Sequence, residues 1–353
     1  MVGETKMNAE KPIAIHDKPG SFSDGWIAYC EENGIPFIRV NCYDDNIISQ
    51  LKGVRALMWH WHHADPAATS FARQLTLSLE RVGVPVFPSS RTAWHFDDKL
   101  GQKYLFETLE VPHVPSFAFY ERKKALNFVK FHGFPLVFKL ARGAGSMNVS
   151  LIENENEARR VISRSFGRGW SGRSRTHAIK ESFWHFRRDR SLSSFLGIGK
   201  GIIRLVIPND ATRSSGLELG YAYFQEFIPN NDSDIRVIVI GGKAFAIRRY
   251  VREGDFRASG SGVIEYDPKY IPDECIRIAF DTTSKIGSQV AALDFVLNGQ
   301  DPLVVEVSYG FSSSAYLKCN GYWDEELEWH EGAIFPEYLM MREFLTELNG
   351  EES

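Results

Sequence analysis

Short apolar runs alternate with helical stretches over the first 90 residues of the chain. The runs at 12–16, 36–40, 55–61 and 84–87 have the length of strands, and the stretches at 22–33 and 69–82 have helical character. Gly34 and Gly83 follow the two helical stretches, at the position where glycine commonly ends a helix. Strands that alternate with helices predict a parallel, three-layer α/β unit.

The rest of the chain mixes further strands and helices without an internal repeat. Asp97 and Asp98 precede Lys99 at a predicted helix start, where acidic side chains favour the helix N-terminus. Strands are predicted at 134–140, 221–227, 234–241 and 243–250, and helices at 155–166, 273–290 and 331–345.

Two carboxylates lie in a pair of apolar runs late in the chain. Asp294 and Glu306 belong to AALDFVLNGQDPLVVEVS, and Asn298-Gly299 between the runs is a strong hairpin signal. The hairpin brings both carboxylates onto neighbouring strands, close enough to share a hard cation. Because Mg²⁺ usually takes one or two carboxylates together with substrate phosphates, the hairpin predicts a magnesium site.

A lysine and a glycine-rich loop lie far upstream of this hairpin. The apolar strand FPLVFKL carries Lys139 and runs into residues 142–146, which contain Gly143 and Gly145. Such a loop can fold over phosphates and offer them backbone N–H groups. The lysine strand, the glycine loop and the carboxylate hairpin together predict ATP binding.

In these segments the chain resembles the ATP-grasp proteins, and among them the RimK-like carboxylate–amine ligases. The resemblance covers roughly residues 85–345 and is carried, in order, by FDDKLGQ, FPLVFKLARGAG, YFQEFIPNNDSDIRVIVIGGK, EGDFR and LDF followed by VVEVS. It implies an α/β (α+β) ATP-grasp fold. A pre-ATP-grasp α/β domain is expected at 1–90, a small lobe at 91–220 with a basic insertion at about 163–213, and a C-terminal lobe with the metal site at 221–353.

The resemblance also implies a role for each matching residue, with ATP and Mg²⁺ as cofactors. Lysine neutralises phosphates as a point charge, and arginine suits planar oxyanions. The implied roles are α/β-phosphate binding by Lys99 and Lys139; the loop over the phosphates by Gly143, Gly145 and Ser146; the adenine edge by Gln225, Glu226, Phe227 and Ile228; ribose binding by Glu226 or by Asp232 and Asp234; contact with the transferring phosphoryl and the substrate carboxylate by Arg236, Arg249 and Arg257; and Mg²⁺ binding by Asp294, Glu306 and Ser308.

Two positions depart from the family pattern. Ser308 stands where the third metal ligand is usually Asn, and Ser259 stands where Asn usually follows DFR. A serine hydroxyl binds Mg²⁺ more weakly, so both changes favour a variant branch. The tail CNGYWDEELEWHEGAIFPEY resembles ATP-grasp proteins of bacterial capsule and surface-polysaccharide gene clusters.

The activity that the resemblance implies is amide-bond formation through an acylphosphate. The γ-phosphoryl moves to the carboxylate of a small molecule or glycan, and an amine then displaces phosphate, while the protein supplies positioning and charge stabilisation. Two alternatives stay open: an ATP-grasp phosphotransferase that acts on a small molecule or sugar, and a catalytically weak nucleotide-binding scaffold.

Composition limits the partners and the compartment. The chain has 353 residues, 43% of them hydrophobic, and its net charge of −4 gives no overall field toward nucleic acid. Four widely spaced cysteines indicate the reduced thiols of a cytosolic protein. We expect neither a secretory signal nor a membrane span, because no apolar run of the required kind occurs. The expected protein is therefore cytoplasmic and has no nucleic-acid partner, and the resemblance leaves a homodimer open.

Two local patterns lie outside this scheme. Residues 159–213 contain thirteen Lys and Arg against three Asp and Glu. A solvated or oligomer-contact face is the first interpretation, followed by contact of 180–207 with an acidic substrate or a membrane surface. In WHWHH, His60 and His62 share a strand face with His63 beyond them. A metal site, a ligand pocket at the end of the strand and simple packing stay open for these histidines.

Overall fold

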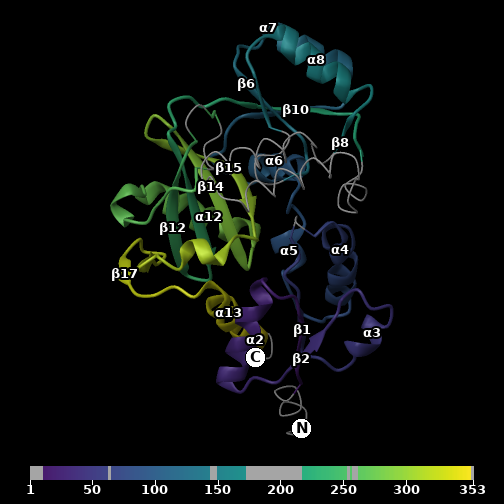
Figure 1. The fold of residues 1–353 in the computed structure, drawn as a ribbon, viewed down its shortest axis with the longest axis vertical. Helices are drawn as coiled ribbons and strands as arrows, with labels where there is room; N and C mark the ends of the chain where they lie inside the picture. The colour runs from purple at the N-terminus through teal and green to yellow at the C-terminus, as the bar shows by residue number, and fades with distance from the viewer. Residues whose placement is uncertain are drawn as a thin grey trace, which may run out of the picture.

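The computed structural model describes residues 11–62, 65–143, 149–171, 217–252, 255–256 and 261–350. In Figure 1 the N-terminal unit lies at the bottom, a middle unit with α7 and α8 at the top, and the large C-terminal sheet between and beside them. Some predictions fall outside the described residues and stay predictions: those for His63, Gly145, Ser146, Arg257, Ser259, the segment 180–207 and most of 163–213.

The N-terminal unit is a parallel sheet of four strands, as the sequence predicted, and its strand order is β2-β1-β3-β4. Ser21 caps α2 by accepting from the Ser23 N–H, and Gly34, at a φ of 65°, ends it. The third strand is shorter than predicted, because residues 59–61 leave the sheet as a buried loop. The elements are β1 (Ile13–His16), α2 (Phe22–Asn33), β2 (Phe37–Val40), α3 (Ile47–Gln50), β3 (Ala56–Met58), α4 (Pro66–Arg81), β4 (Val86–Phe87) and α5 (Ser90–Ala93).

The middle unit is an antiparallel sheet with the order β5-β10-β6-β7. Helices α7 and α8 pack on one face of this sheet, over Phe138 and Phe224. Strand β10 belongs here, although the sequence placed the C-terminal lobe from residue 221, and the domain limits stay predictions. The elements are α6 (Lys99–Thr108), β5 (Ser116–Phe119), α7 (Arg122–Phe131), β6 (Leu136–Lys139), β7 (Ser150–Ile152), α8 (Glu155–Ser165), β8 (Trp170–Ser171), β9 (Leu217–Glu218) and β10 (Ala222–Glu226).

The C-terminal unit is a sheet of seven strands with the order β15-β14-β11-β12-β16-β17, and β13 pairs with β12. Two predicted helices are corrected. Gly287, at a φ of 68°, ends α12, and Val290 already begins β14, whereas the last helix begins only at Pro336 because 329–331 form a strand. The elements are β11 (Ser233–Ile240), β12 (Lys243–Tyr250), β13 (Ile264–Glu265), η1 (Pro268–Tyr270), α12 (Asp273–Ile286), β14 (Val290–Asn298), β15 (Asp301–Ser308), η2 (Ser313–Tyr316), β16 (Gly321–Trp323), β17 (Trp329–Glu331) and α13 (Pro336–Gly350).

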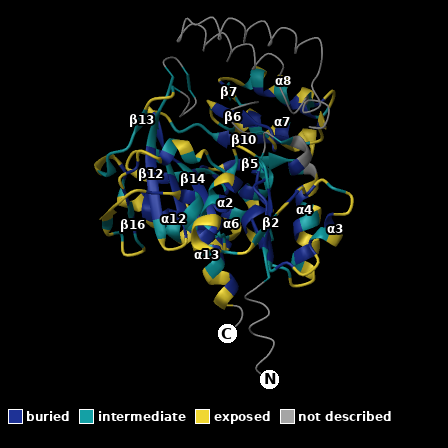
Figure 2. Ribbon diagram, turned by 60° about the horizontal axis from the view of Figure 1, so that its bottom comes forward, coloured by how far each residue is buried: buried dark blue, intermediate teal, exposed yellow. Residues whose placement is uncertain are grey.

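A continuous hydrophobic core joins the N-terminal unit to one face of the C-terminal sheet and to α13. Figure 2 shows this as buried residues along the strands, with exposed residues on the outer turns of helices such as α3 and α13. All four cysteines are buried and unpaired by disulfides. Within the part of the chain that the structure describes, no helix combines the length and apolar character that a bilayer crossing requires.

Candidate functional site

The hairpin of β14 and β15 places Asp294 directly opposite Glu306. Cross-strand neighbours on one face have Cβ atoms about 4.5–5.5 Å apart, so the two carboxylates are adjacent. The register shifts at the next step, where Phe295 pairs with Val304 and leaves Val305 as an extra residue beside Glu306. Such a bulge re-aims neighbouring side chains, and here it lies next to an acidic one.

Strand β11 supplies the wall beside this hairpin. Its residues alternate between two faces, so Asp234, Arg236, Ile238 and Ile240 share one face. The two isoleucines pack in the core shared with the N-terminal unit. Asp234 and Arg236 lie toward the other end of the strand, at its start, and line a cavity. Arg236 is the register partner of Asp294, so the strand order brings it to the carboxylate hairpin.

Two lysines of the middle unit face this wall. Lys99 begins α6 and Lys139 ends β6, and each is only 7% exposed. The Lys99 Nζ lies 3.7 Å from Glu306 Oε1 and donates to the Gly143 carbonyl at 2.7 Å. The Lys139 Nζ donates to Gln225 Oε1 at 2.5 Å. The Lys139 ammonium is therefore oriented by a neutral amide, and among the described residues no carboxylate forms a direct ion pair with it.

A cavity of about 730 Å³ is lined by the two lysines on one side and by the acidic and arginine wall on the other, and Lys99 and Glu306 approach each other at its edge. This volume falls in the range of roughly 300–1,000 Å³ that is typical of small-molecule sites. The structure thus brings the predicted site residues together, while the role of each stays a prediction. Those that line the cavity are Lys99, Lys139, Gly143, Gln225, Glu226, Phe227, Ile228, Asp234, Arg236, Arg249, Asp294, Glu306 and Ser308.

The segment between β10 and β11 crosses from the middle sheet to the C-terminal sheet along this cavity. Asn231 in the crossing donates to the Leu297 carbonyl at 3.0 Å and accepts from the Leu297 N–H at 2.8 Å. This paired contact attaches the crossing to β14, so the cavity wall at residues 227–232 is anchored to the carboxylate hairpin.

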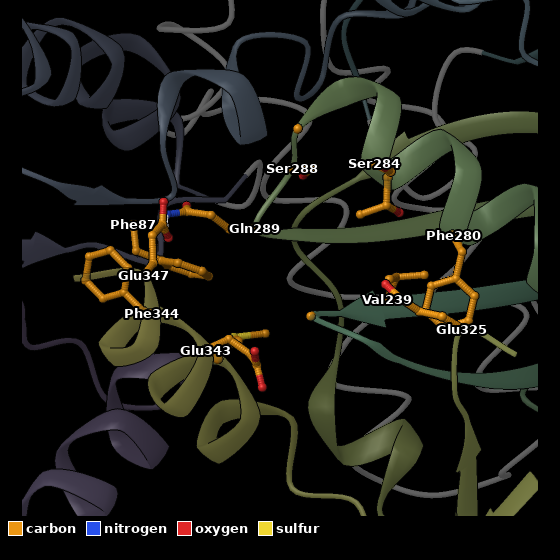
Figure 3. A pocket seen from close by; sticks show the side chains of 14 residues that line it. Phe87, Val239, Phe280, Ser284, Ser288, Gln289, Glu325, Glu343, Phe344 and Glu347 are labelled. Atoms are coloured by element: carbon orange, nitrogen blue, oxygen red, sulfur yellow. Dashed lines mark hydrogen bonds between the residues drawn. The ribbon is translucent and has the colours of Figure 1, made fainter. Parts of the chain in front are cut away.

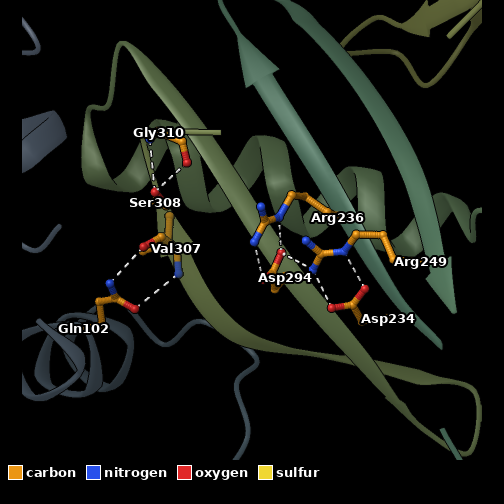
Figure 4. A network of polar contacts seen from close by, with 8 residues as sticks. All are labelled: Gln102, Asp234, Arg236, Arg249, Asp294, Val307, Ser308 and Gly310. Carbon is orange, nitrogen blue, oxygen red and sulfur yellow. Dashed lines mark hydrogen bonds and ion pairs between the residues drawn. The ribbon is translucent and has the colours of Figure 1, made fainter. Parts of the chain in front are cut away.

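Arg236 and Arg249 bind carboxylates within their own wall (Figure 4). Arg236 donates from Nε and Nη2 to the two oxygens of Asp294, at 2.5 and 2.6 Å. Arg249 donates from Nε to Asp234 at 2.7 Å and lies 3.1 Å from Asp294. Burial alone would raise the pKa of Asp294, but Arg236 and Arg249 outweigh burial and hold this pKa below its usual value. The sequence assigned these arginines to substrate anions and did not reveal their carboxylate partners.

The titration of Lys139 reflects its surroundings. Burial lowers the pKa of Lys139 to about 8, and nearby Lys99 acts in the same direction, while Glu306 and Asp294 oppose both. An ammonium with so little water around it interacts strongly with an anion that enters the cavity. Asp234 shifts the other way, because burial raises the pKa of this carboxyl to about 6.

Asp97 is a cavity residue that the sequence analysis did not single out as a site residue. Its Oδ1 accepts from the Gly143 N–H at 2.7 Å, while Lys99 holds the Gly143 carbonyl. Burial raises the pKa of Asp97, against the lowering effect of Lys99. Asp97 has a φ of 55°, which Asp tolerates better than most residues. In the sequence Asp97 stands beside Asp98, which caps α6, and both were interpreted as part of the helix start. The contact of Asp97 with the glycine loop has no signal in the sequence.

Asp294 and Glu306 provide a donor set that suits Mg²⁺. The Ser308 hydroxyl takes part in a turn, because it donates to the Gly310 carbonyl at 2.9 Å and accepts from the Gly310 N–H at 3.0 Å. Among the described residues, no group of three or more His, Cys, Asp or Glu is placed to hold a metal. Two carboxylates fit an ion whose remaining ligands are phosphate and water oxygens, as is usual for Mg²⁺.

The histidines of WHWHH take part in packing where the structure describes them. The His60 Nδ1 accepts from the Phe22 N–H at 3.0 Å, and the His60 ring stacks on Phe22 with 3.7 Å between centroids. Trp59 and Trp61 are buried in the same core. These contacts attach the start of α2 to the end of β3, which favours the packing interpretation over a zinc site.

A second cavity, of about 290 Å³, lies between α13, the end of α12 and the turn after β11 (Figure 3). Glu325, Glu343 and Glu347 line it, and Glu347 accepts from Gln289 Nε2 at 3.0 Å. None of the described residues around it is Lys or Arg. This cavity is therefore unsuited to phosphates and separate from the predicted site.

Comparison with known proteins agrees with this geometry. Residues 210–320 match the family model of the RimK-like ATP-grasp domain. A probable alpha-L-glutamate ligase of Parasynechococcus marenigrum (strain WH8102) is 27% identical over 250 residues, which cover 69% of this chain and 42% of that protein. The chain spans about two fifths of the length of the curated relatives it matches.

Two solved structures share the fold. The RimK domain ATP-grasp protein of Sphaerobacter thermophilus DSM 20745 superposes with a TM-score of 0.53 at 14% identity, over 94% of this chain and 98% of that one. The D-alanine–D-alanine ligase of Bacillus anthracis in complex with ATP gives 0.56 at 12% identity, over 97% and 99%.

The chain thus shares the fold of these solved structures, one of them an ATP-grasp protein, which confirms the predicted fold class. More particularly, residues 210–320 are similar to the RimK-like ATP-grasp domain, as the sequence indicated. ATP and Mg²⁺ are the cofactors of this class. The predicted link to surface polysaccharides is not tested by these likenesses and stays a prediction.

Proposed function

We propose that the chain is an ATP- and Mg²⁺-dependent ligase that joins a carboxylate to an amine through an acylphosphate. The observation that carries this proposal is the cavity in which Lys99 and Lys139 face Asp294 and Glu306. The pairing of two ammonium groups with two carboxylates across one cavity suits a triphosphate with a bound cation. The likeness to alpha-L-glutamate ligases supports ATP-dependent ligation as the reaction class.

The nucleotide would lie along the lysine side of the cavity. Lys99 and Lys139 would hold phosphate oxygens, with Gly143 at the start of the loop over them, and residues 226–228 would border the base. The structure favours Glu226 for the ribose, because Asp234 pairs with Arg249 and Asp232 pairs with Arg248 at 3.1 Å. Asp294 and Glu306 would hold Mg²⁺, which neutralises charge on the β- and γ-phosphates.

The chemistry would need no covalent bond to the protein. The carboxylate oxygen of the substrate takes the γ-phosphoryl, and ADP leaves. The amine nitrogen then attacks the acyl carbon, phosphate leaves with the C–O bond electrons, and the nitrogen loses a proton. Arg249 and Arg236 would keep Asp294 and the developing charges in place, because a fixed network requires little reorganisation during the reaction.

The substrates belong to the same proposal. The tail resemblance supports a carboxylate on a uronic-acid-containing sugar or its precursor, and the amine is an amino compound such as an amino acid. The basic segment 180–207, outside the described residues, would suit an acidic or lipid-linked substrate.

Product analysis tests the function. We expect ADP and free phosphate in equal amounts, released only when a sugar acid and an amine are both present. Lys139→Ala and Glu306→Ala abolish this turnover, and ADP release that persists in either variant contradicts the assignment. A phosphorylated product in place of free phosphate would identify a phosphotransferase, and ATP binding without turnover would identify a scaffold.

A further inference from the structure

Strand β15, which carries Glu306, is the edge strand of the C-terminal sheet. One side of an edge strand has backbone groups without a strand partner. Here the middle unit covers that side in two places. Val304 donates to the Pro112 carbonyl at 2.9 Å and accepts from the Val114 N–H at 3.0 Å. Further along, Gln102 of α6 contacts Val307.

The side-chain amide of Gln102 forms hydrogen bonds to this edge in place of a neighbouring strand. Its Nε2 donates to the Val307 carbonyl at 2.8 Å, and its Oε1 accepts from the Val307 N–H at 3.2 Å (Figure 4). The same Nε2 donates to the His95 carbonyl at 3.0 Å. Gln102 is 3% exposed, so water does not compete for these bonds. Val307 lies between Glu306 and Ser308, so the Gln102 amide holds the backbone of β15 directly beside Glu306, the proposed metal ligand.

The same helix, α6, carries both Gln102 and Lys99, which lines the cavity on the side proposed for the phosphates. Lys99 and Gln102 are three residues apart and therefore lie on one face of the helix. Lys99 lies 3.7 Å from Glu306, while Gln102 holds the following residue. The bulge at Val305 interrupts the ladder to β14 at this point, so that ladder alone does not fix the path of the strand.

We propose that Gln102 is a positioning residue that sets Glu306 relative to Lys99, and thereby sets how strongly Mg²⁺ promotes nucleotide binding. This inference rests on the proposed function. Gln102 does not line the large cavity, and it would act through the backbone of β15. Residues that orient metal ligands in this way typically change metal affinity by roughly 10–100-fold when they are replaced.

The test measures ATP affinity by calorimetry with and without Mg²⁺. We expect the wild-type chain to bind ATP more tightly with Mg²⁺ than without it. The Mg²⁺ gain is the ratio of the ATP affinity with Mg²⁺ to the ATP affinity without it. We expect this ratio to fall roughly tenfold in Gln102→Leu, while the ATP affinity without Mg²⁺ stays close to that of the wild type. Gln102→Glu keeps an acceptor for the Val307 N–H but has no donor for its carbonyl, so an intermediate loss is expected.

Gln289→Leu is the matched control. Gln289 also bonds backbone groups, of Val86 at 3.3 Å and Ser89 at 2.8 Å, but it lines the second cavity (Figure 3). Its Mg²⁺ gain should equal that of the wild type. An unchanged gain in Gln102→Leu, or an equal loss with and without Mg²⁺, overturns the inference. If Gln102→Leu does not fold, the Gln102→Glu titration decides by the same criteria. A wild-type chain that binds no ATP overturns the proposed function itself.

Discussion

The two walls of the cavity carry similar charges but arrange them differently. On the wall formed by β11, β12 and β14, the guanidinium groups of Arg236 and Arg249 are bound to Asp234 and Asp294. On the wall formed by β6 and α6, Lys139 donates to the neutral oxygen of Gln225. The first wall neutralises itself within the protein, whereas the second keeps positive charge that an anionic ligand can compensate.

This difference predicts a larger effect on stability at the first wall, which also carries the proposed Mg²⁺ ligand Asp294, and a larger effect on ligand binding at the second. A buried charge that has lost its partner is strongly destabilising, so the arginine wall should matter to the fold. A buried lysine without an ion pair is disfavoured in the folded chain, as its lowered pKa indicates, so the lysine wall should matter to the ligand. The predictions below test this division.

The largest effect is expected for Asp294→Asn, which leaves Arg236 without its carboxylate. We expect the free energy of unfolding to fall by about 3 kcal/mol, the order known for a broken buried ion pair. Urea denaturation measures it, with Asp232→Asn as the control because Asp232 is exposed. Its pair with Arg248 should contribute less than about 1 kcal/mol. Equal losses in both variants would contradict the division between the walls.

Lys139→Met should act in the opposite way on the lysine wall. We expect ATP to bind roughly 100-fold more weakly, because a desolvated charge partner of the phosphates is lost. The free energy of unfolding should rise, by about 1 kcal/mol or more, because a folded-state pKa below the usual lysine value opposes folding at neutral pH. Calorimetry and urea denaturation measure the two quantities, and a parallel fall in both would show that Lys139 supports the fold.

A smaller effect is expected from pH alone. Lys139, with its pKa lowered to about 8, is charged below that pH and neutral above it. ATP affinity should therefore be nearly constant from about pH 6.5 to 7.5 and fall as the pH rises beyond 8, by at most about tenfold per unit. Lys139→Arg should remove this fall, because arginine stays protonated throughout the range. A fall that persists in Lys139→Arg would have to come from another group.

Local sequence signals predicted the pieces of the site better than their contacts. Asn298-Gly299 fixed the hairpin, and its register placed Asp294 opposite Glu306. The pairing of Arg236 with Asp294 depends on β11 lying beside β14, which joins segments 58 residues apart and has no local signal. Gln102 resembles any polar helical residue in sequence. Its importance appears only when α6 is packed against the edge of the sheet.

The predicted ends of helices were least accurate where the local sequence pattern and the packing of the folded chain favour different structures. The predicted helix continued to Val290, but the left-handed Gly287 ends α12 and the chain enters the core of the sheet at Val290. Glu331 was assigned to the final helix, whereas pairing with β16 holds it in a strand.

The crossing from β10 to β11 constrains how the protein could open for its ligands. Asn231 fixes this short connection to Leu297, so the margin of the cavity at residues 227–232 is held to the carboxylate hairpin independently of the middle unit. Rotation of the middle unit would then pivot about this margin, and the width of the entrance would change most at the far end, beside Gly143. A nucleotide could settle its base first and have its phosphates enclosed afterwards.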